Sequence, residues 1–198
     1  NLNLLTNNSI SNIVDNSRYV WIGTWKGLNL YDKQTCKIIP FPDTRLLDKG
    51  INYMAADKED NIWIGAGNTI YRCNSTASIA REYDIFGSQQ NKHTINFVYQ
   101  DREGNMWVLT GGGLFKYDDK SDSFITYPPL GKNNAPYTMC QDQSGNYWIG
   151  TWGEGLWQFF PQKEGEECYK RHHIINSRSG ETEPIFYSMT QDNAFGYL

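Results

Sequence analysis

The sequence has no long hydrophobic run, no cluster of basic residues and no closely spaced cysteine pair, and each absence excludes a class of protein. No stretch approaches the 18 or more apolar residues of a membrane-spanning helix, and residues 1–6 lack the charged start and apolar middle of a signal peptide. The net charge is −4, without a basic patch that could attract phosphates. We therefore expect a soluble chain that binds no nucleic acid.

The four cysteines, Cys36, Cys73, Cys140 and Cys168, are too scattered to suggest a metal site. None belongs to a CxxC pair, and no histidine accompanies them at a zinc-binding spacing. Free cysteines are usually buried, so we expect buried thiols, although an oxidising compartment would allow disulfides that the sequence does not pair. We predict no metal and no cofactor.

Aromatic residues and an internal repeat are what the chain has in abundance. Aromatic residues make up 15% of the sequence, with 7 Trp and 13 Tyr, and this composition favours strands. Copies of a Trp-Ile-Gly-Thr block begin at Trp21, Trp63, Trp107 and Trp148, about 40 residues apart. This period is typical of propeller blades.

Each repeat predicts a meander of four strands. An apolar stretch leads to an Asp six residues before the Trp, and then to a turn in which Asp101, for example, caps backbone amides while Gly104 supplies a positive φ. The Trp block, a Gly-Leu strand and a short strand near prolines complete the unit. The first copy departs from this pattern, because Arg18 stands where the glycine would be.

These units predict an all-β fold, a β-propeller fragment of four-stranded antiparallel blades. One meander cannot bury both of its faces, so neighbouring blades must stack face to face, with the four repeat tryptophans buried on the same strand of each blade. Four blades and one strand do not close a ring of about seven blades, so we expect a fragment with open edges. We expect a single partial propeller domain over residues 1–198, with repeats at about 10–50, 51–94, 95–135 and 136–184 and the start of a fifth blade at 185–198.

The complete pattern resembles the two-component regulator propeller repeat. It reads Ile-x-x-Ile/Val/Met-x-x-Asp, a Gly-Asn turn, Trp-Ile-Gly-Thr, Gly-Leu and Tyr-Asp, and it recurs over nearly the whole chain. The resemblance implies the periplasmic input region of a hybrid two-component histidine kinase, in which such propellers sense glycan breakdown products. It also implies that the kinase and the membrane helix belong to a longer parent protein.

Catalytic chemistry finds little support in the sequence. The turn aspartates recur once per repeat, as turn-capping residues do, and are not spaced as paired acids. His93, His172 and His173 occupy polar, loop-like stretches without a partner carboxylate or a nucleophile elbow, so we expect them to be exposed. We predict no catalytic residue, and a propeller lyase or glycosidase is the least favoured hypothesis.

Candidate binding residues gather on one face of the predicted propeller. In a meander, the links after the second and fourth strands emerge on the same face, and here these links are variable, polar and aromatic. Planar rings beside polar groups suit a sugar, although the rings could instead shield glycine links or pack on an adjacent blade. The ligand-binding candidates are Trp25, Lys26, Arg45, Trp152 and Glu154.

Longer links complete this face. Residues 89–93 and 132–133 add polar side chains. Residues 161–184 form the longest insertion, which predicts a solvated hairpin extension or, alternatively, a partner contact.

The sequence therefore predicts a periplasmic sensor domain that recognises an oligosaccharide and signals to a kinase outside the chain. Its expected partners are further blades of the same polypeptide and a second copy in a homodimer. The alternative is a scaffold propeller that binds other proteins and no small ligand.

Overall fold

The computed structural model describes residues 5–87, 93–131, 135–175 and 177–190, and within them the chain forms four antiparallel sheets of four strands each. In every sheet the strands lie side by side in chain order. Two short 3-10 helices, η1 (Thr44–Leu46) and η2 (Gly165–Cys168), lie between strands. The strands are β1 (Ile10–Asp15), β2 (Tyr19–Thr24), β3 (Gly27–Asp32), β4 (Lys37–Pro40), β5 (Ile51–Ala56), β6 (Ile62–Ala66), β7 (Thr69–Cys73), β8 (Ile79–Tyr83), β9 (Ile95–Gln100), β10 (Met106–Thr110), β11 (Gly113–Asp118), β12 (Ser123–Thr126), β13 (Ala135–Gln141), β14 (Tyr147–Trp152), β15 (Leu156–Phe159) and β16 (Tyr169–His172).

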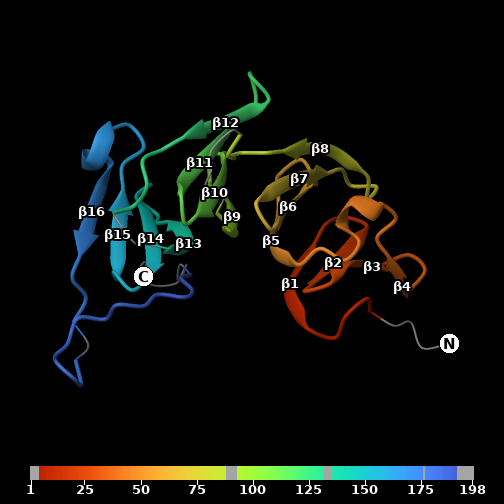
Figure 1. Ribbon diagram of the computed structural model, residues 1–198, viewed down its shortest axis with the longest axis horizontal. Coiled ribbons are helices and arrows are strands. Elements are labelled where there is room, and N and C mark those ends of the chain that lie inside the picture. The colour runs from red at the N-terminus through yellow and green to blue at the C-terminus, as the bar shows by residue number, and fades with distance from the viewer. Residues whose placement is uncertain (1–4, 88–92, 132–134, 176, 191–198) are drawn as a thin grey trace.

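The four sheets follow one another along an arc, with the first strand of each sheet toward the inside and the fourth toward the outside (Figure 1). The inner strands contact each other in sequence, β1 with β5, β5 with β9 and β9 with β13. Within the described residues the arc is open, with the first and fourth sheets at its two ends. The predicted all-β fold, a propeller fragment of four-stranded blades with open edges, is confirmed.

The repeat tryptophan occupies the same place in each sheet. Trp21, Trp63, Trp107 and Trp148 lie in β2, β6, β10 and β14, which is the second strand each time. The first three are buried, and Trp63 packs 4.8 Å from the ring of Tyr117 in the next sheet. The prediction that these tryptophans share one strand position is confirmed, and three of them form the cores between blades.

Trp148 corrects the expectation that all four tryptophans are buried. Tyr147 and Ile149 pack against the third sheet, so the alternation along β14 turns Trp148 toward the opposite face. No further sheet covers that face in the part of the chain that the structure describes. Trp148 is therefore only half-buried, with the ring of His172 at 5.0 Å and Phe186 beside it.

The glycine of the Trp-Ile-Gly block allows successive sheets to approach closely. A Cβ on Gly23 would lie 2.7 Å from Cγ2 of Ile51, and one on Gly65 would lie 2.6 Å from Cγ2 of Ile95. Each isoleucine begins the first strand of the next sheet. The glycine is thus required by packing between blades, a role that the sequence pattern did not assign.

Residues 185–190 begin to pair as the predicted first strand of a fifth repeat but do not form it. Ile185 makes an isolated bridge with Trp152, and the Phe186 N–H donates to the Thr151 carbonyl at 3.0 Å. A Cβ on Gly150 would lie 2.7 Å from the Cβ of Phe186. Phe186 thus packs on the glycine of the fourth repeat as an isoleucine packs on the glycine of each of the first two repeats. Residues 186–190 have no strand pairing, and residues 191–198 lie outside the described part.

Three of the four turns between first and second strands share one hydrogen-bonded structure. Oδ1 of Asp57, Asp101 and Asp142 accepts from the backbone N–H four residues later, at 2.7 to 2.8 Å. Oδ2 accepts from the indole Nε1 of the same repeat's tryptophan, at 2.8 to 2.9 Å. Gly104 has the expected positive φ of 92°. The predicted turn capping is confirmed, and the bond to the tryptophan is an additional role for the carboxylate.

The first repeat replaces this turn with a shorter one. Asn16 Oδ1 accepts from the Tyr19 N–H at 2.9 Å, while the Asn16 N–H donates to the Tyr19 carbonyl. Asp15 is left at the surface, where it pairs with Lys33 at 2.9 Å. The indole Nε1 of Trp21 is consequently buried without a hydrogen-bond partner.

Three local expectations need correction. Residues 161–184 form a hairpin extension only in part: Ile175 makes an antiparallel bridge with Thr182, but the same segment also contains η2 and β16, the fourth strand of the fourth sheet. Cys36 is exposed, whereas the other three cysteines are buried and free. His172 lies in a strand, and both His93 and His172 are half-buried.

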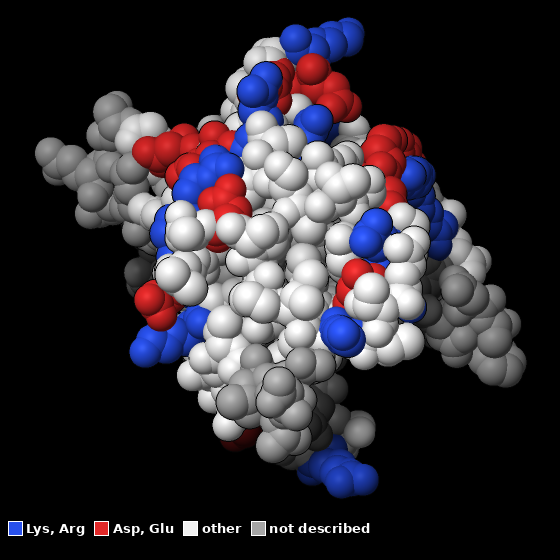
Figure 2. All heavy atoms as spheres, turned by 90° about the vertical axis from the view of Figure 1, so that its right-hand side faces the viewer, with Lys and Arg blue, Asp and Glu red and all other residues white. Residues whose placement is uncertain are grey.

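The first sheet presents an open apolar face at one end of the arc. Trp21 faces the second sheet, so Val20 and Ile22 point the other way, with Ile13 paired opposite Ile22. Ile13 is 58% exposed. Figure 2 shows this end of the molecule, with charged side chains around the rim and uncharged residues in the centre.

No helix among the described residues is long and apolar enough to cross a membrane.

Candidate functional site

The links after the second and fourth strands meet on one face, which we call the loop face. The Gly27 N–H donates to the Lys49 carbonyl at 2.8 Å, and the Ile95 N–H donates to the Gly67 carbonyl at 2.9 Å. At the far end of the arc, the Gly153 N–H donates to the Pro184 carbonyl at 2.9 Å. The predicted grouping of these links is therefore correct. Residues 88–92 and 132–134 of this face lie outside the described part.

The threonine that ends the Trp block shapes the links that carry the candidate residues. Thr24 Oγ1 donates to the Gly27 carbonyl at 2.7 Å and accepts from the Lys26 N–H at 3.1 Å. Thr151 Oγ1 likewise donates to the Gly155 carbonyl at 2.8 Å. Because these buried hydroxyls satisfy the link's backbone, the side chains between them are free to face solvent.

Trp25 lies beside Gly50, which lines a groove of mixed polar and apolar character on the loop face. Its side chain is 59% exposed, and its Cε3 would lie 3.5 Å from a Cβ on Gly50. The groove has a volume of about 370 Å³, and its other walls include Lys49, Asn52 and Asn68. Trp25 is therefore an exposed ring beside hydrogen-bonding groups, as expected.

Trp152 belongs to an exposed cluster of three aromatic rings, which we call the aromatic platform. Its ring lies 4.7 Å from Tyr187 and 5.7 Å from Tyr137, and the three side chains are 46%, 60% and 38% exposed, respectively. Sequence reasoning missed both tyrosines. The signal was present, since Tyr137 and Tyr187 occupy the repeat position at which the second and third repeats have Asn52 and Asn96.

Two of the three charged candidates, Arg45 and Glu154, are less available than the rings because each is held in an ion pair. Arg45 forms a two-pronged pair with Asp43, through Nη2 at 2.7 Å and Nε at 3.1 Å, and this bonding holds the pKa of Asp43 below its usual range. Glu154 pairs with Arg171 at 3.0 Å. Lys26 is exposed. A ligand at Arg45 would have to compete with Asp43.

The five candidates divide into two groups. Trp25 and Lys26 lie in the link of the first sheet, whereas in the fourth sheet Trp152 is the last residue of β14 and Glu154 lies in the link that follows it. Arg45 lies in η1, between the first and second sheets. The first and fourth sheets lie at the two ends of the arc (Figure 1), so the two exposed tryptophans belong to separate parts of the loop face.

The repeat aspartates are structural acceptors and not free acids. Asp101 is 3% exposed and accepts from the Asn105 backbone and side chain, from Trp107 and, at 2.7 Å, from the Tyr147 hydroxyl of the next blade. Burial acts to raise the pKa of Asp101, but these hydrogen bonds together hold it below its usual value. Such a carboxylate stays ionised and internally bonded, so it is poorly suited to proton transfer.

His172 offers no catalytic arrangement in the described structure. Its Nε2 lies 3.3 Å from Gln158 Oε1, and its ring packs on Trp148. Burial, together with nearby Lys170, lowers the pKa of His172. The neighbours of His172 are thus an amide, a ring and a cation, and they do not form a nucleophile–base pair.

Solved structures define the class of this fold. The chain aligns with the extracellular domain of a proposed hybrid two-component system of B. thetaiotaomicron at a TM-score of 0.76 and 22% identity, over 93% of this chain and 25% of that one. A second such domain from B. thetaiotaomicron aligns at 0.71 and 14%, over 97% and 25%. Virginiamycin B lyase from Staphylococcus aureus aligns at 0.66 and 14%, over 86% and 57%. These likenesses show the β-propeller fold, and the chain spans about a quarter of the length of the two-component ectodomains.

One segment of the chain matches the model of a known repeat family. Residues 130–153 match the family model described as "Two component regulator propeller". This match includes the fourth Trp-Ile-Gly-Thr block, and it confirms the resemblance that was read from the pattern. No curated protein matches the chain significantly.

Proposed function

We propose that this chain is the sensing part of a two-component regulator and that it binds an oligosaccharide on the loop face. The observation that carries the proposal is the aromatic platform of Tyr137, Trp152 and Tyr187, an exposed group of rings in a protein whose other described aromatic side chains, apart from Trp25, are buried or half-buried. Exposed aromatic clusters of this kind are expected at binding surfaces.

The chemistry of the platform suits a sugar ring. The C–H face of a pyranose packs on an indole or phenol ring, while its hydroxyls need donors and acceptors at the edge. Glu154 and Arg171 supply both, because their ion pair at 3.0 Å lies at the link that follows Trp152 and is partly exposed. Trp25 and its groove would offer a second contact for a longer chain of sugars.

The wider role rests on the family repeat. A periplasmic sensor of this kind would pass a conformational bias to a histidine kinase elsewhere in the parent protein, and the chain itself would catalyse no reaction. Further blades of the same polypeptide, or a second copy, would cover the open apolar faces at the two ends of the arc.

A glycan array probed with the 198-residue chain tests the binding site, followed by titration of each hit against variants. We expect Trp152→Ala and Tyr137→Ala to weaken a hit by about tenfold, the usual effect of truncating an aromatic anchor. Ile125→Ala is the matched control, since Ile125 is 49% exposed on β12 and does not belong to the aromatic platform. Equal binding by Trp152→Ala and the wild type would contradict the site.

An array without a hit would favour the scaffold alternative, in which the loop face or the blade ends contact protein. Sedimentation of the chain then distinguishes self-association from a monomer, because an open blade face that pairs with a second copy makes the apparent mass depend on concentration. A concentration-independent monomer would contradict the proposed homodimer.

A further inference from the structure

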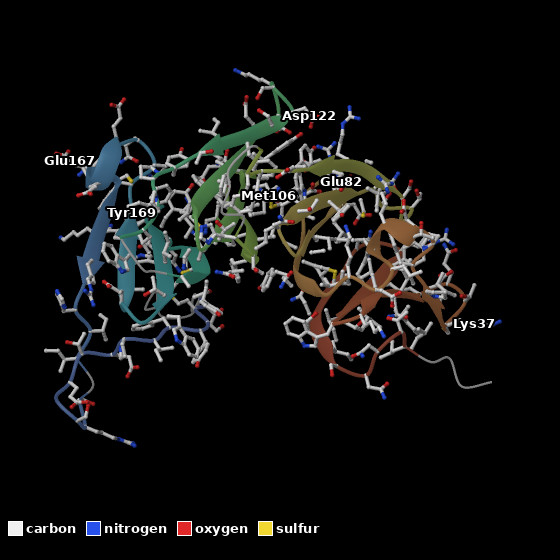
Figure 3. The ribbon with its side chains drawn as sticks, viewed as in Figure 1. Lys37, Glu82, Met106, Asp122, Glu167 and Tyr169 are labelled. Carbon is white, nitrogen blue, oxygen red and sulfur yellow. The ribbon has the colours of Figure 1, made fainter. Side chains whose placement is uncertain are left out.

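A second, polar cavity lies on the opposite face, between the second and third sheets. We call this face the turn face, because it carries the turns built on Asp57, Asp101 and Asp142. The cavity has a volume of about 310 Å³, at the lower end of the range for small-molecule sites. Met106, which lines it, lies between the second and third sheets in Figure 3. The cavity shares no lining residue with the aromatic platform.

A single cation, Arg72 of β7, lines this cavity. Its guanidinium packs between two rings, with Cζ 5.5 Å from the centre of Trp63 and 5.8 Å from that of Tyr117. Nη1 donates to the Tyr117 hydroxyl at 2.9 Å, and that hydroxyl donates to Asp122 at 2.7 Å. Nε is buried without a partner, and Arg72 forms no ion pair within the described residues. Nη2 makes no hydrogen bond within the described residues, so it is the donor that remains for a ligand in the cavity that Arg72 lines.

Carboxylates with no internal partner line the same cavity. Glu59 and Asp119 are exposed, and in the described part of the chain neither side chain accepts a hydrogen bond or forms an ion pair. Glu103 also lines the cavity and accepts from Gln141 at 2.9 Å. The cavity thus combines one under-used cation with two free carboxylates, all held on rigid strands and tight turns.

We propose that this cavity binds a free amino acid or a closely related small zwitterion. The ligand carboxylate would accept from the Arg72 guanidinium, and its ammonium group would be held by Glu59 and Asp119. A simple anion would be repelled by the carboxylates, and a simple cation would leave the guanidinium donors unused. A molecule that carries both charges a few bonds apart satisfies both groups at once, and the cavity volume admits a small side chain beside Trp63.

Calorimetric titration of the 198-residue chain with a panel of free L-amino acids, from glycine to tryptophan, tests this proposal. We expect at least one to bind saturably below roughly 10 mM, the range of weak small-molecule sites. Its N-acetyl and methyl ester derivatives, which each lack one charge, should bind about tenfold or more weakly.

Variants separate this cavity from other sites. Arg72→Gln should weaken binding by about tenfold or more, and Glu59→Gln by several-fold, since each removes one charge-assisted contact. Arg18→Gln is the matched control, because Arg18 is an exposed arginine that pairs with Asp32 in the first sheet and does not line the cavity. Trp152→Ala should leave amino-acid binding unchanged, so failure here is distinct from failure of the loop-face site.

Three results would overturn the proposal. One is that no member of the panel binds, and another is that the blocked derivatives bind as well as the free amino acid. The third is that Glu59→Gln retains wild-type affinity. Glu59 is exposed and has no internal partner, so this variant folds even if Arg72→Gln does not.

Discussion

The turn face and the loop face are built from the same repeats. The residues of the turn face recur from blade to blade, whereas the exposed residues of the loop face differ between blades. On the turn face, Asp57, Asp101 and Asp142 make the same bonds to their turn and to their tryptophan in three consecutive blades. On the loop face, the equivalent links carry an exposed tryptophan only in the first and fourth blades, at Trp25 and Trp152.

This difference distinguishes residues that hold the blades together from residues that are free to bind. A feature that recurs in register satisfies a need that every blade has, such as filling the space between sheets or capping a turn. A ring that appears in only some links and stays exposed meets no such need, so it is available for recognition. Substitutions of the recurring aspartates and tryptophans should therefore reduce stability, whereas substitutions of the exposed loop-face rings should reduce binding.

The largest loss of stability is expected from the repeat tryptophans. Trp63→Ala and Trp107→Ala should each lower the free energy of unfolding by about 3–5 kcal/mol, because each leaves a large cavity between two sheets. Trp148→Ala should cost clearly less, since its ring is only half-buried. Urea unfolding measures all three, and equal losses at Trp148 and Trp107 would contradict the packing described.

The next largest loss of stability is expected from substitutions of the turn carboxylates. Asp101→Ala should cost about 2–4 kcal/mol, because it leaves the Trp107 indole, the Tyr147 hydroxyl and the turn amides without an acceptor. Asp15→Ala should cost less than about 1 kcal/mol, because the first repeat uses Asp15 only in a surface pair with Lys33. Comparable losses in the two variants would show that the short first turn and the other turns are equivalent.

Acid should reduce the contribution that Asp101 makes to the free energy of unfolding. The pKa of Asp101 is held below its usual value in the folded protein, so the stability that it contributes is present above the unfolded-state pKa near 4 and is lost as pH falls through the folded-state pKa. The stability gap between wild type and Asp101→Asn should therefore narrow from pH 5 to about pH 2. Unfolding curves across this range measure it, and a constant gap would contradict the assignment.

A smaller effect is expected at the positive-φ position of the turn. Gly104→Ala should cost about 1–2 kcal/mol, because a Cβ strains the backbone at a φ of 92°. Asp60 takes the same position in the second blade at a φ of 69°, and it accepts hydrogen bonds from the Ser17 backbone and side chain across the blade boundary. Asp60→Gly should therefore gain little, since backbone relief is offset by the loss of Ser17. A clear stabilisation in Asp60→Gly would show that the contact with Ser17 contributes nothing.

The fold was predictable because its signals are local and recur. The spacing of Trp63 and Trp107, and the Asp and Gly residues of the turn at 101–105, each depend on a few neighbouring residues. Trp148 could not be called half-buried from its motif, because its exposure depends on what packs on the far side of the last sheet. The hydrogen bond from the tryptophan indole to the aspartate six residues earlier could not be predicted from the spacing alone, because it depends on the geometry of the two strands and their turn.

The candidate site was predictable in part. The exposure of Trp25 and Trp152 was expected from a place in the links, although the structure places Trp152 at the end of β14 and only Trp25 in a link. Tyr137 was missed because it lies within a first strand, which the pattern treats as core, and its exposure comes from the register of β13 with β14. The pairing of Glu154 with Arg171 was missed because β16 has no repeat motif.

The most direct test compares Trp152→Ala with Trp63→Ala in the same two assays, thermal unfolding and affinity for a glycan identified on the array. Trp152→Ala should keep a melting temperature close to that of the wild type and lose about tenfold or more in affinity. Trp63→Ala should melt far earlier, and the fraction that remains folded should bind normally. If Trp152→Ala melted as early as Trp63→Ala and its folded fraction bound the glycan with wild-type affinity, the loop tryptophan would be a core residue and the division between the two faces would be wrong.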